Sequence, residues 1–177
     1  MVTLHVPDSK YFCATEPRYE TKFIALHNIG VAGQTALQAH RYFSDPEKKR
    51  YAGIQFCVDL DGTVYEFADR DCVVYHVGGK MYTPYMLNRY HEYTLNEYKY
   101  TPNWISCGVE MCHPGEDGKP TAETLAATQA LVKELLTYYH LTGDNVLRHY
   151  DVTGKNCPAY YVTHFDAWRK FQGVCNG

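Results

Sequence analysis

Short apolar runs separated by polar and glycine-rich segments recur along the chain, and they predict the strands of a sheet. The run at residues 22–28 is apolar and ends in His27-Asn28, which is typical of a buried strand with a polar end. Two β-rich runs flank Leu60-Asp61-Gly62, a strong hairpin signal. The predicted strands span residues 22–28, 53–59, 63–67, 72–77 and 104–112.

Helical spacing of apolar positions appears in three other segments. Residues 35–43 place Ala36, Leu37, His40 and Phe43 at helical intervals. Residues 121–141 predict the clearest helix, with Thr121 able to cap its start and Gly143 just beyond its end. A last short helix is predicted at residues 161–171, whereas the segment up to residue 19 and the tyrosine-rich segment 82–100 predict loops.

The order of these elements predicts one domain of the α/β (α+β) class. Strands and helices interleave around a central mixed β-sheet flanked by helices, and no repeat or linker divides residues 1–177. A chain of 177 residues is long enough for one sizeable core and short for two. The 17 tyrosines, many of them at 82–100, suit a groove that grips sugar or peptide, although a packed loop is an equal alternative.

Charge and hydropathy exclude several classes of function. The net charge of −3 and the absence of a basic stripe give no case for a nucleic-acid partner. No run of about 18 apolar residues predicts a membrane segment, and the first residues do not resemble a signal peptide. We therefore expect synthesis in the reducing cytoplasm, where the seven cysteines form no disulfides, and a monomeric protein.

The segment 148–158 carries the strongest chemical signal. It holds His149, Lys155 and Cys157, and imidazole and thiolate are the ligands that zinc prefers. A catalytic zinc ion usually takes three protein ligands, so a third must come from elsewhere. His27 is a candidate because it ends an apolar strand, where open sheets place their chemistry. The alternative, a buried Cys157 beside a solvated Lys155, stays open on these grounds.

Four segments in the same order resemble the zinc-dependent N-acetylmuramoyl-L-alanine amidases of the type 2 family. This family includes bacteriophage endolysins, bacterial autolysins and the peptidoglycan recognition proteins. The resemblance covers about residues 20–172 and is nearest to the endolysin branch of phages of Gram-positive hosts. The matching segments are Leu26-His27-Asn28, His76-Val77-Gly78-Gly79, Gly108-Val109-Glu110-Met111-Cys112, and Arg148 to Pro158 with His149, Lys155 and Cys157.

The resemblance implies a role for each matching residue. One zinc ion is held by His27, His149 and Cys157, and Glu110 matches the acidic catalytic residue of the endolysin branch. Lys155 matches the lysine that faces the scissile carbonyl. His76, Gly78 and Gly79 match a segment that lines the substrate groove. An ion pair with a nearby Lys or Arg is the alternative for Glu110.

The chain departs from the family pattern at one place. Some members carry a catalytic tyrosine after the glycine that opens the hairpin strand, and here Ile54 follows Gly53. Tyr51 is near in sequence but out of register. Glu110 is therefore the better candidate for proton transfer.

The function implied is hydrolysis of the amide between N-acetylmuramic acid and L-alanine in bacterial peptidoglycan, as the catalytic domain of a phage endolysin. Such an enzyme acts on the cell wall after release and lyses the host. A wall-binding domain beyond Gly177 is then a possible missing part. Two alternatives remain: a peptidoglycan-binding module without catalysis, which usually lacks the cysteine ligand, and a cytoplasmic muropeptide-recycling amidase, which usually has aspartate at that position.

Overall fold

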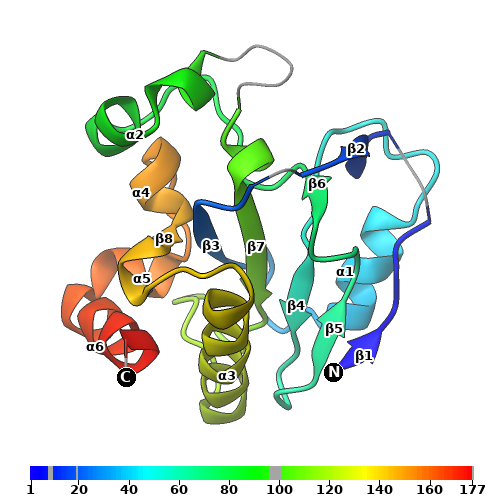
Figure 1. Ribbon diagram of the computed structural model, residues 1–177. Coiled ribbons are helices and arrows are strands. Elements are labelled where there is room, and N and C mark those ends of the chain that lie inside the picture. Colours follow the sequence, from blue (N-terminus) through cyan, green and yellow to red (C-terminus); the bar gives the residue numbers. More distant parts are fainter. Residues whose placement is uncertain (8–9, 19, 96–100, 177) are drawn as a thin grey trace.

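A six-stranded mixed sheet lies at the centre of the protein, as the computed structural model shows (Figure 1). The structure describes residues 1–7, 10–18, 20–95 and 101–176. Strands β4 (Phe56–Val58) and β5 (Val64–Glu66) pair antiparallel as the predicted hairpin, and every other neighbouring pair is parallel. The strands run in the order β1 (Val2–Thr3), β5 (Val64–Glu66), β4 (Phe56–Val58), β7 (Ser106–Met111), β3 (Phe23–Asn28) and β8 (Val146–Arg148). A second, two-stranded sheet pairs β2 (Cys13–Pro17) with β6 (Cys72–Val74).

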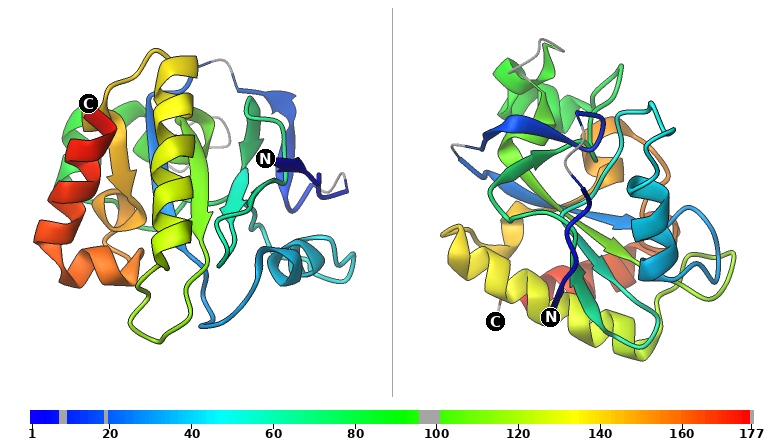
Figure 2. Two further views of the ribbon diagram at one scale, coloured as in Figure 1. Left: turned by 90° about the horizontal axis from the view of Figure 1, so that it is seen from below. Right: turned by 90° about the vertical axis from the view of Figure 1, so that its right-hand side faces the viewer.

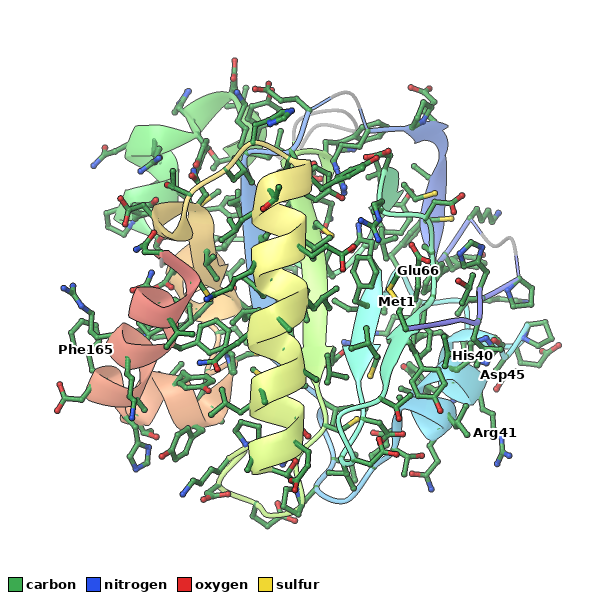
Figure 3. The ribbon with its side chains drawn as sticks, turned by 60° about the horizontal axis from the view of Figure 1, so that its bottom comes forward. Met1, His40, Arg41, Asp45, Glu66 and Phe165 are labelled. Carbon is green, nitrogen blue, oxygen red and sulfur yellow. The ribbon has the colours of Figure 1, made fainter. Side chains whose placement is uncertain are left out.

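Helices lie on both sides of the large sheet (Figure 2). Figure 3 shows α3 crossing one face, with α6 beside it and Phe165 at the outer edge of the molecule. The helices are α1 (Ala36–Phe43), α2 (Pro84–Arg89), α3 (Ala122–Tyr138), α4 (His149–Thr153), α5 (Ala159–Thr163) and α6 (Phe165–Asn176). Short 3-10 turns span His91–Thr94, Pro102–Ile105 and Gly143–Asn145.

Alternation along β3 divides its side chains between two cores. Ile24 and Leu26 pack with α3 and α6 in the larger core. Phe23 and Ala25 point to the opposite face and pack with residues of α2 and α4. Because successive side chains of a strand point to opposite faces, His27 shares the second face with Phe23 and Ala25. The candidate metal ligand His27 therefore lies on the face of the sheet that packs against α2 and α4.

The start of α3 is tied to the hairpin. Thr121 caps the helix by accepting a hydrogen bond from Thr124 N (2.9 Å), and its own hydroxyl donates to Leu60 O (2.8 Å). Gly62 turns the hairpin at φ 81°, and a Cβ there would lie 2.9 Å from Glu123 O. The turn therefore needs glycine both for its backbone angle and for its contact with α3.

Arg18 joins four segments through one buried side chain. Its guanidinium donates to Thr21 Oγ1 (2.8 Å), Cys72 O (3.0 Å) and Ser106 O (2.6 Å), and also to Arg70 O and Tyr139 OH. A buried cation is costly unless its donors are satisfied, and these acceptors satisfy them. Arg18 thereby fixes the small sheet and α3 against the beginning of β7.

The predicted elements differ from the structure in four places. The segment up to residue 19 contains β1 and β2, so its prediction as a loop is wrong. The tyrosine-rich segment contains α2 in place of a continuous loop, and its residues 96–100 lie outside the described residues. Leu37 is 44% exposed, because Ala36 and Ala39 form the buried face of α1. The last predicted helix is two helices, α5 and α6. Within the described residues, no helix is long and apolar enough to cross a membrane.

Candidate metal centre and substrate groove

Two adjacent strands bring His27 and Glu110 to the same end of the sheet. β3 and β7 are parallel, and the Cα atoms of His27 and Glu110 are direct partners in their register. Cys57 of β4 is the partner of Glu110 on its other side. Residues paired across a sheet share a face, so the histidine and the carboxylate point toward the same space. This space lies at the carboxyl ends of parallel strands, where open sheets place their sites.

An ion pair positions His149, the first residue of α4. Arg148 ends β8, and its backbone N–H and guanidinium Nε both donate to Asp151 Oδ2, at 2.8 and 3.0 Å. Its Nη2 donates to Asp151 Oδ1 (2.6 Å), and Nη1 donates to Tyr161 O (2.8 Å). A partly buried bidentate pair of this kind fixes direction as well as distance. His149 therefore leaves β8 aimed at His27.

Gly154 and Asn28 return Cys157 to the same place. Gly154 ends α4 in the left-handed conformation (φ 77°), and the chain turns back so that Tyr150 N donates to Cys157 O (2.8 Å). Asn28, directly after His27, accepts a hydrogen bond from Ala159 N at its Oδ1 (2.7 Å). Strand β3, which carries the candidate ligand His27, thus holds the loop that carries the candidate ligand Cys157.

The donor atoms of His27, His149 and Cys157 fit one zinc ion. Zinc–nitrogen bonds of about 2.05 Å and a zinc–sulfur bond of about 2.3 Å at tetrahedral angles place two nitrogens about 3.3 Å apart and a nitrogen and a sulfur about 3.6 Å apart. Here His27 Nδ1 lies 3.1 Å from His149 Nδ1 and 3.8 Å from Cys157 Sγ. All three donors lie within 4.8 Å of one another, and all three residues are buried. The donor set is one that zinc prefers.

Burial sets the protonation of these ligands in the metal-free protein. Burial, with the positive charge of Lys155 in second place, lowers the pKa of His149 to about 4, and burial holds the pKa of His27 well below its usual range. Both imidazoles are neutral and ready to coordinate. Burial raises the pKa of the Cys157 thiol to about 12, although the backbone N–H of Asn28 favours the thiolate. Metal binding at this candidate site would therefore release one proton, from Cys157.

A chain of hydrogen-bonding groups lies behind His27. His27 Nε2 lies 3.0 Å from His76 Nδ1, and His76 Nε2 lies 3.1 Å from Ser106 Oγ. Ser106 Oγ in turn donates to Pro102 O (2.7 Å). His76 thus contacts a candidate ligand, whereas the sequence suggested only that it lines a groove. Burial lowers the pKa of His76 to about 3, so this ring is neutral as well.

Glu110 and Lys155 are the charged groups of the site. Burial raises the pKa of Glu110 to about 7, against the opposing effects of Lys155 and His113. Among the ion pairs between described residues, none includes Glu110, so the alternative of a structural ion pair finds no support there. A carboxyl group with a pKa near 7 takes up and gives back a proton at neutral pH. Lys155 is exposed, and its charge acts on the pKa of Glu110, His149 and Cys157 alike.

A groove of about 740 Å³ reaches the site at His149, Lys155 and His76, which are among its lining residues. Three cations, Arg50, Lys80 and Lys155, line it, and no carboxylate is among the described residues of its lining. Tyr51 and Tyr75 form one wall, with ring centroids 5.2 Å apart in an edge-to-face contact. The other lining residues are Ala52, His76, Gly78, Gly79, Asn103 and His149.

Both predicted groove glycines, Gly78 and Gly79, line this groove, and each also packs against protein. A Cβ on Gly79 would lie 2.9 Å from Thr153 Cγ2, and one on Gly78 would lie 3.0 Å from Asn103 Nδ2. Their small size therefore brings the segment after β6 against α4. Ile54 is buried and faces Gly108, whereas Tyr51 lines the groove.

Sequence reasoning missed several residues that build the site. Ser106 and Asn28 hold other groups by hydrogen bonds, and Arg50 and Lys80 give the groove its charge. Asn28 had a signal in the sequence because it adjoins His27, whereas Ser106, a serine at the start of a strand, had none. Arg50 and Lys80 had none, because their approach to the site depends on loop paths.

Comparison with known proteins identifies the family of this chain. The family model described as N-acetylmuramoyl-L-alanine amidase matches residues 17–160. The chain belongs to this amidase family. A probable N-acetylmuramoyl-L-alanine amidase of Bacillus licheniformis is 34% identical over 143 residues, covering 80% of this chain and 37% of the relative. The amidase BlyA of Bacillus subtilis (strain 168) is 29% identical over 169 residues, covering 95% of this chain and 44% of the relative. The chain thus spans less than half the length of these relatives.

Solved structures share the fold of this amidase family member. The catalytic domain of XlyA superposes with a TM-score of 0.73 at 20% identity, covering 98% of this chain and 97% of that domain. A mutant endolysin from Bacillus subtilis gives a TM-score of 0.72 at 23% identity, with coverage of 98% and 97%. PlyL gives 0.74 at 17% identity, with coverage of 100% and 97%. The predicted fold, a mixed sheet flanked by helices, is confirmed.

Proposed function

We propose that this chain is a zinc-dependent catalytic domain that hydrolyses the amide between N-acetylmuramic acid and L-alanine of the stem peptide in bacterial peptidoglycan. The proposal includes a phage endolysin as the parent protein, with action on the cell wall after release from the cytoplasm and a monomeric state. Family membership and the names of the relatives support the reaction. The convergence of two imidazoles and a thiolate beside Glu110 is the observation that carries it.

The residues present divide the work of amide hydrolysis. His27, His149 and Cys157 would hold one zinc ion, which supplies Lewis-acid chemistry for attack on an amide carbonyl. Glu110 takes a proton from the attacking water and gives it to the leaving amine nitrogen, a transfer that suits its pKa of about 7. Lys155 places a fixed positive charge beside the oxygen on which negative charge develops.

The groove suits the peptide side of this substrate. Stem peptides carry carboxylates, and the cations Arg50, Lys80 and Lys155 lie along the groove without a neighbouring carboxylate among its described lining. Exposed charges of this kind steer and orient an anionic ligand more than they bind it tightly. His76, Gly78 and Gly79 would contribute to the wall nearest the metal.

Metal analysis combined with wall digestion tests the proposal. Chelator-treated protein is reloaded with zinc, incubated with purified cell walls, and the new chain ends are identified. We expect one zinc per chain, new amino-terminal alanine, and no new reducing sugar ends. New reducing ends would mean a glycosidase, and zinc binding without any release would mean a binding module.

Paired cysteine variants supply the matched control. Cys157→Ala and His27→Ala lose zinc and activity together. Cys107→Ala keeps both, because Cys107 is equally buried but lies in the core beneath α3. Retention of stoichiometric zinc by Cys157→Ala would contradict the proposed ligand set.

A further inference from the structure

The hydrogen bonds that link His27 to Pro102 through His76 and Ser106 have donor and acceptor roles that can be assigned starting from Pro102. Pro102 O is a carbonyl oxygen and only accepts, so the Ser106 hydroxyl proton points to it (2.7 Å). Ser106 Oγ is then left as an acceptor for His76 Nε2 (3.1 Å), which must therefore carry a proton. One placement of protons therefore satisfies both hydrogen bonds of Ser106.

The proton on His76 Nε2 also assigns the roles in the hydrogen bond between His76 and the candidate ligand His27. His76 Nδ1, without a proton, accepts from His27 Nε2 at 3.0 Å. A nitrogen that binds a metal carries no proton, so with His27 Nε2 donating to His76 the Nδ1 atom presents its lone pair toward His149 and Cys157. The acceptor at Pro102 thereby determines which nitrogen of His27 carries the lone pair.

The surrounding chain is shaped to keep this arrangement. Asn103 Oδ1 accepts from the backbone N–H groups of His76 and Val77, at 2.9 Å each. Gly108 leaves room for the His76 ring, since a Cβ there would lie 2.8 Å from His76 Nδ1. Ser106 is fully buried and is not part of the groove lining, so it has no access to substrate there.

We propose that His76 and Ser106 are positioning residues that hold His27 in the tautomer and orientation needed to bind the metal. The proposal rests on the proposed metal site at His27, His149 and Cys157. It assigns His76 a task besides lining the groove, and it assigns Ser106 a task that its buried place otherwise leaves unexplained. Partners of this kind commonly change metal affinity by about 10-fold to 100-fold when removed.

Zinc affinity, measured by competition with a chelator, is the readout that a substrate-binding role would not move. We expect His76→Leu and Ser106→Ala to weaken zinc binding by about 10-fold to 100-fold. His76→Asn lies between wild type and His76→Leu, because an amide oxygen still accepts from His27 Nε2. Cobalt-loaded His76→Leu shows an altered visible absorption spectrum, because the orientation of a ligand changes.

Thr128→Val is the matched control. It removes one fully buried hydroxyl, which donates to Thr124 O (2.7 Å) on the far side of the sheet, and it leaves zinc affinity unchanged. If His76→Leu fails to fold, the comparison of Ser106→Ala with Thr128→Val decides. Zinc affinities within about twofold of wild type, accompanied by a raised KM in His76→Asn, would make His76 a substrate-binding residue and overturn the inference. Failure of the wild-type chain to bind zinc would overturn the proposed function itself.

Discussion

Replacing Glu110 with glutamine should stabilise the metal-free protein and should abolish most of the activity of the zinc-loaded protein. The carboxylate sits among apolar strands, and burial raises its pKa from 4.5 to about 7. A carboxyl group whose pKa is raised on folding favours the unfolded state once the pH is high enough to ionise it. Glutamine keeps the shape and removes the charge, so the penalty disappears with the proton transfer.

The size of the effect follows from the two pKa values. With 4.5 in the unfolded chain and about 7 in the folded chain, the charge costs about 0.4 kcal/mol at pH 4.5 and about 3 kcal/mol at pH 8. The contribution of Glu110 to the free energy of unfolding therefore falls as the pH rises from 4.5 to 7. Above pH 7 both states are ionised, and the penalty stays constant.

Urea denaturation of the chelator-treated proteins at pH 4.5 and pH 8 measures the difference. Glu110→Gln should exceed wild type by about 3 kcal/mol at pH 8 and by less than about 1 kcal/mol at pH 4.5. Glu116→Gln makes the same chemical change away from the site and should give little difference at either pH. Wall digestion by zinc-loaded Glu110→Gln should fall by about 100-fold or more.

Two results would refute this reasoning. A gain in stability that is equal at both pH values would show that the carboxylate is not held in an unfavourable environment. Near-normal digestion by Glu110→Gln would show that another group carries the proton.

Further substitutions test the rest of the site. Lys155→Gln should keep zinc and lose about 100-fold in kcat, as expected for loss of a group that stabilises developing charge; an unchanged kcat would remove it from the mechanism. Arg50→Gln and Lys80→Gln should each raise KM by about twofold to fivefold and weaken the salt dependence of digestion, and equal salt dependence would show that the groove charges do not meet the substrate. Gly108→Ala adds a methyl group that would lie 2.4 Å from Ile54 Cδ1, so it should cost about 1–3 kcal/mol in urea denaturation and weaken zinc binding. Gly173→Ala, where nothing lies within 4 Å, should do neither and serves as its control.

The large sheet was predictable where apolar runs were long enough to define a strand. β3 and β7 each show six residues with a polar group near the end, and the hairpin was marked by its turn. β1 and β2 were not predicted because they are short, with two and five residues, and their pairing partners lie far along the chain. α2 was not predicted because its tyrosine-rich segment shows no helical periodicity of apolar residues. Thr83 and Pro84 nevertheless form an ordinary helix start.

The candidate site was predictable for residues whose chemistry is unusual in their context. His27 and Glu110 are polar positions within apolar strands, and Cys157 shares one short segment with the imidazole of His149. Ser106 carries no such signal, since a serine beginning a strand is ordinary. Its significance depends on the approach of His76 from the small sheet, a contact across 30 positions of sequence.

The positions of the three proposed metal ligands along the chain have a consequence for folding. His27 and Cys157 are 130 residues apart, and His149 is 122 residues from His27. Because β3 must already lie between β7 and β8 for these side chains to meet, no early segment of the chain forms the site alone. Contacts so distant in sequence form late, after the entropy of closing long loops has been overcome. High-affinity metal uptake is therefore expected only once the sheet is complete, and the zinc content of a preparation then measures the fraction of chains that have finished folding.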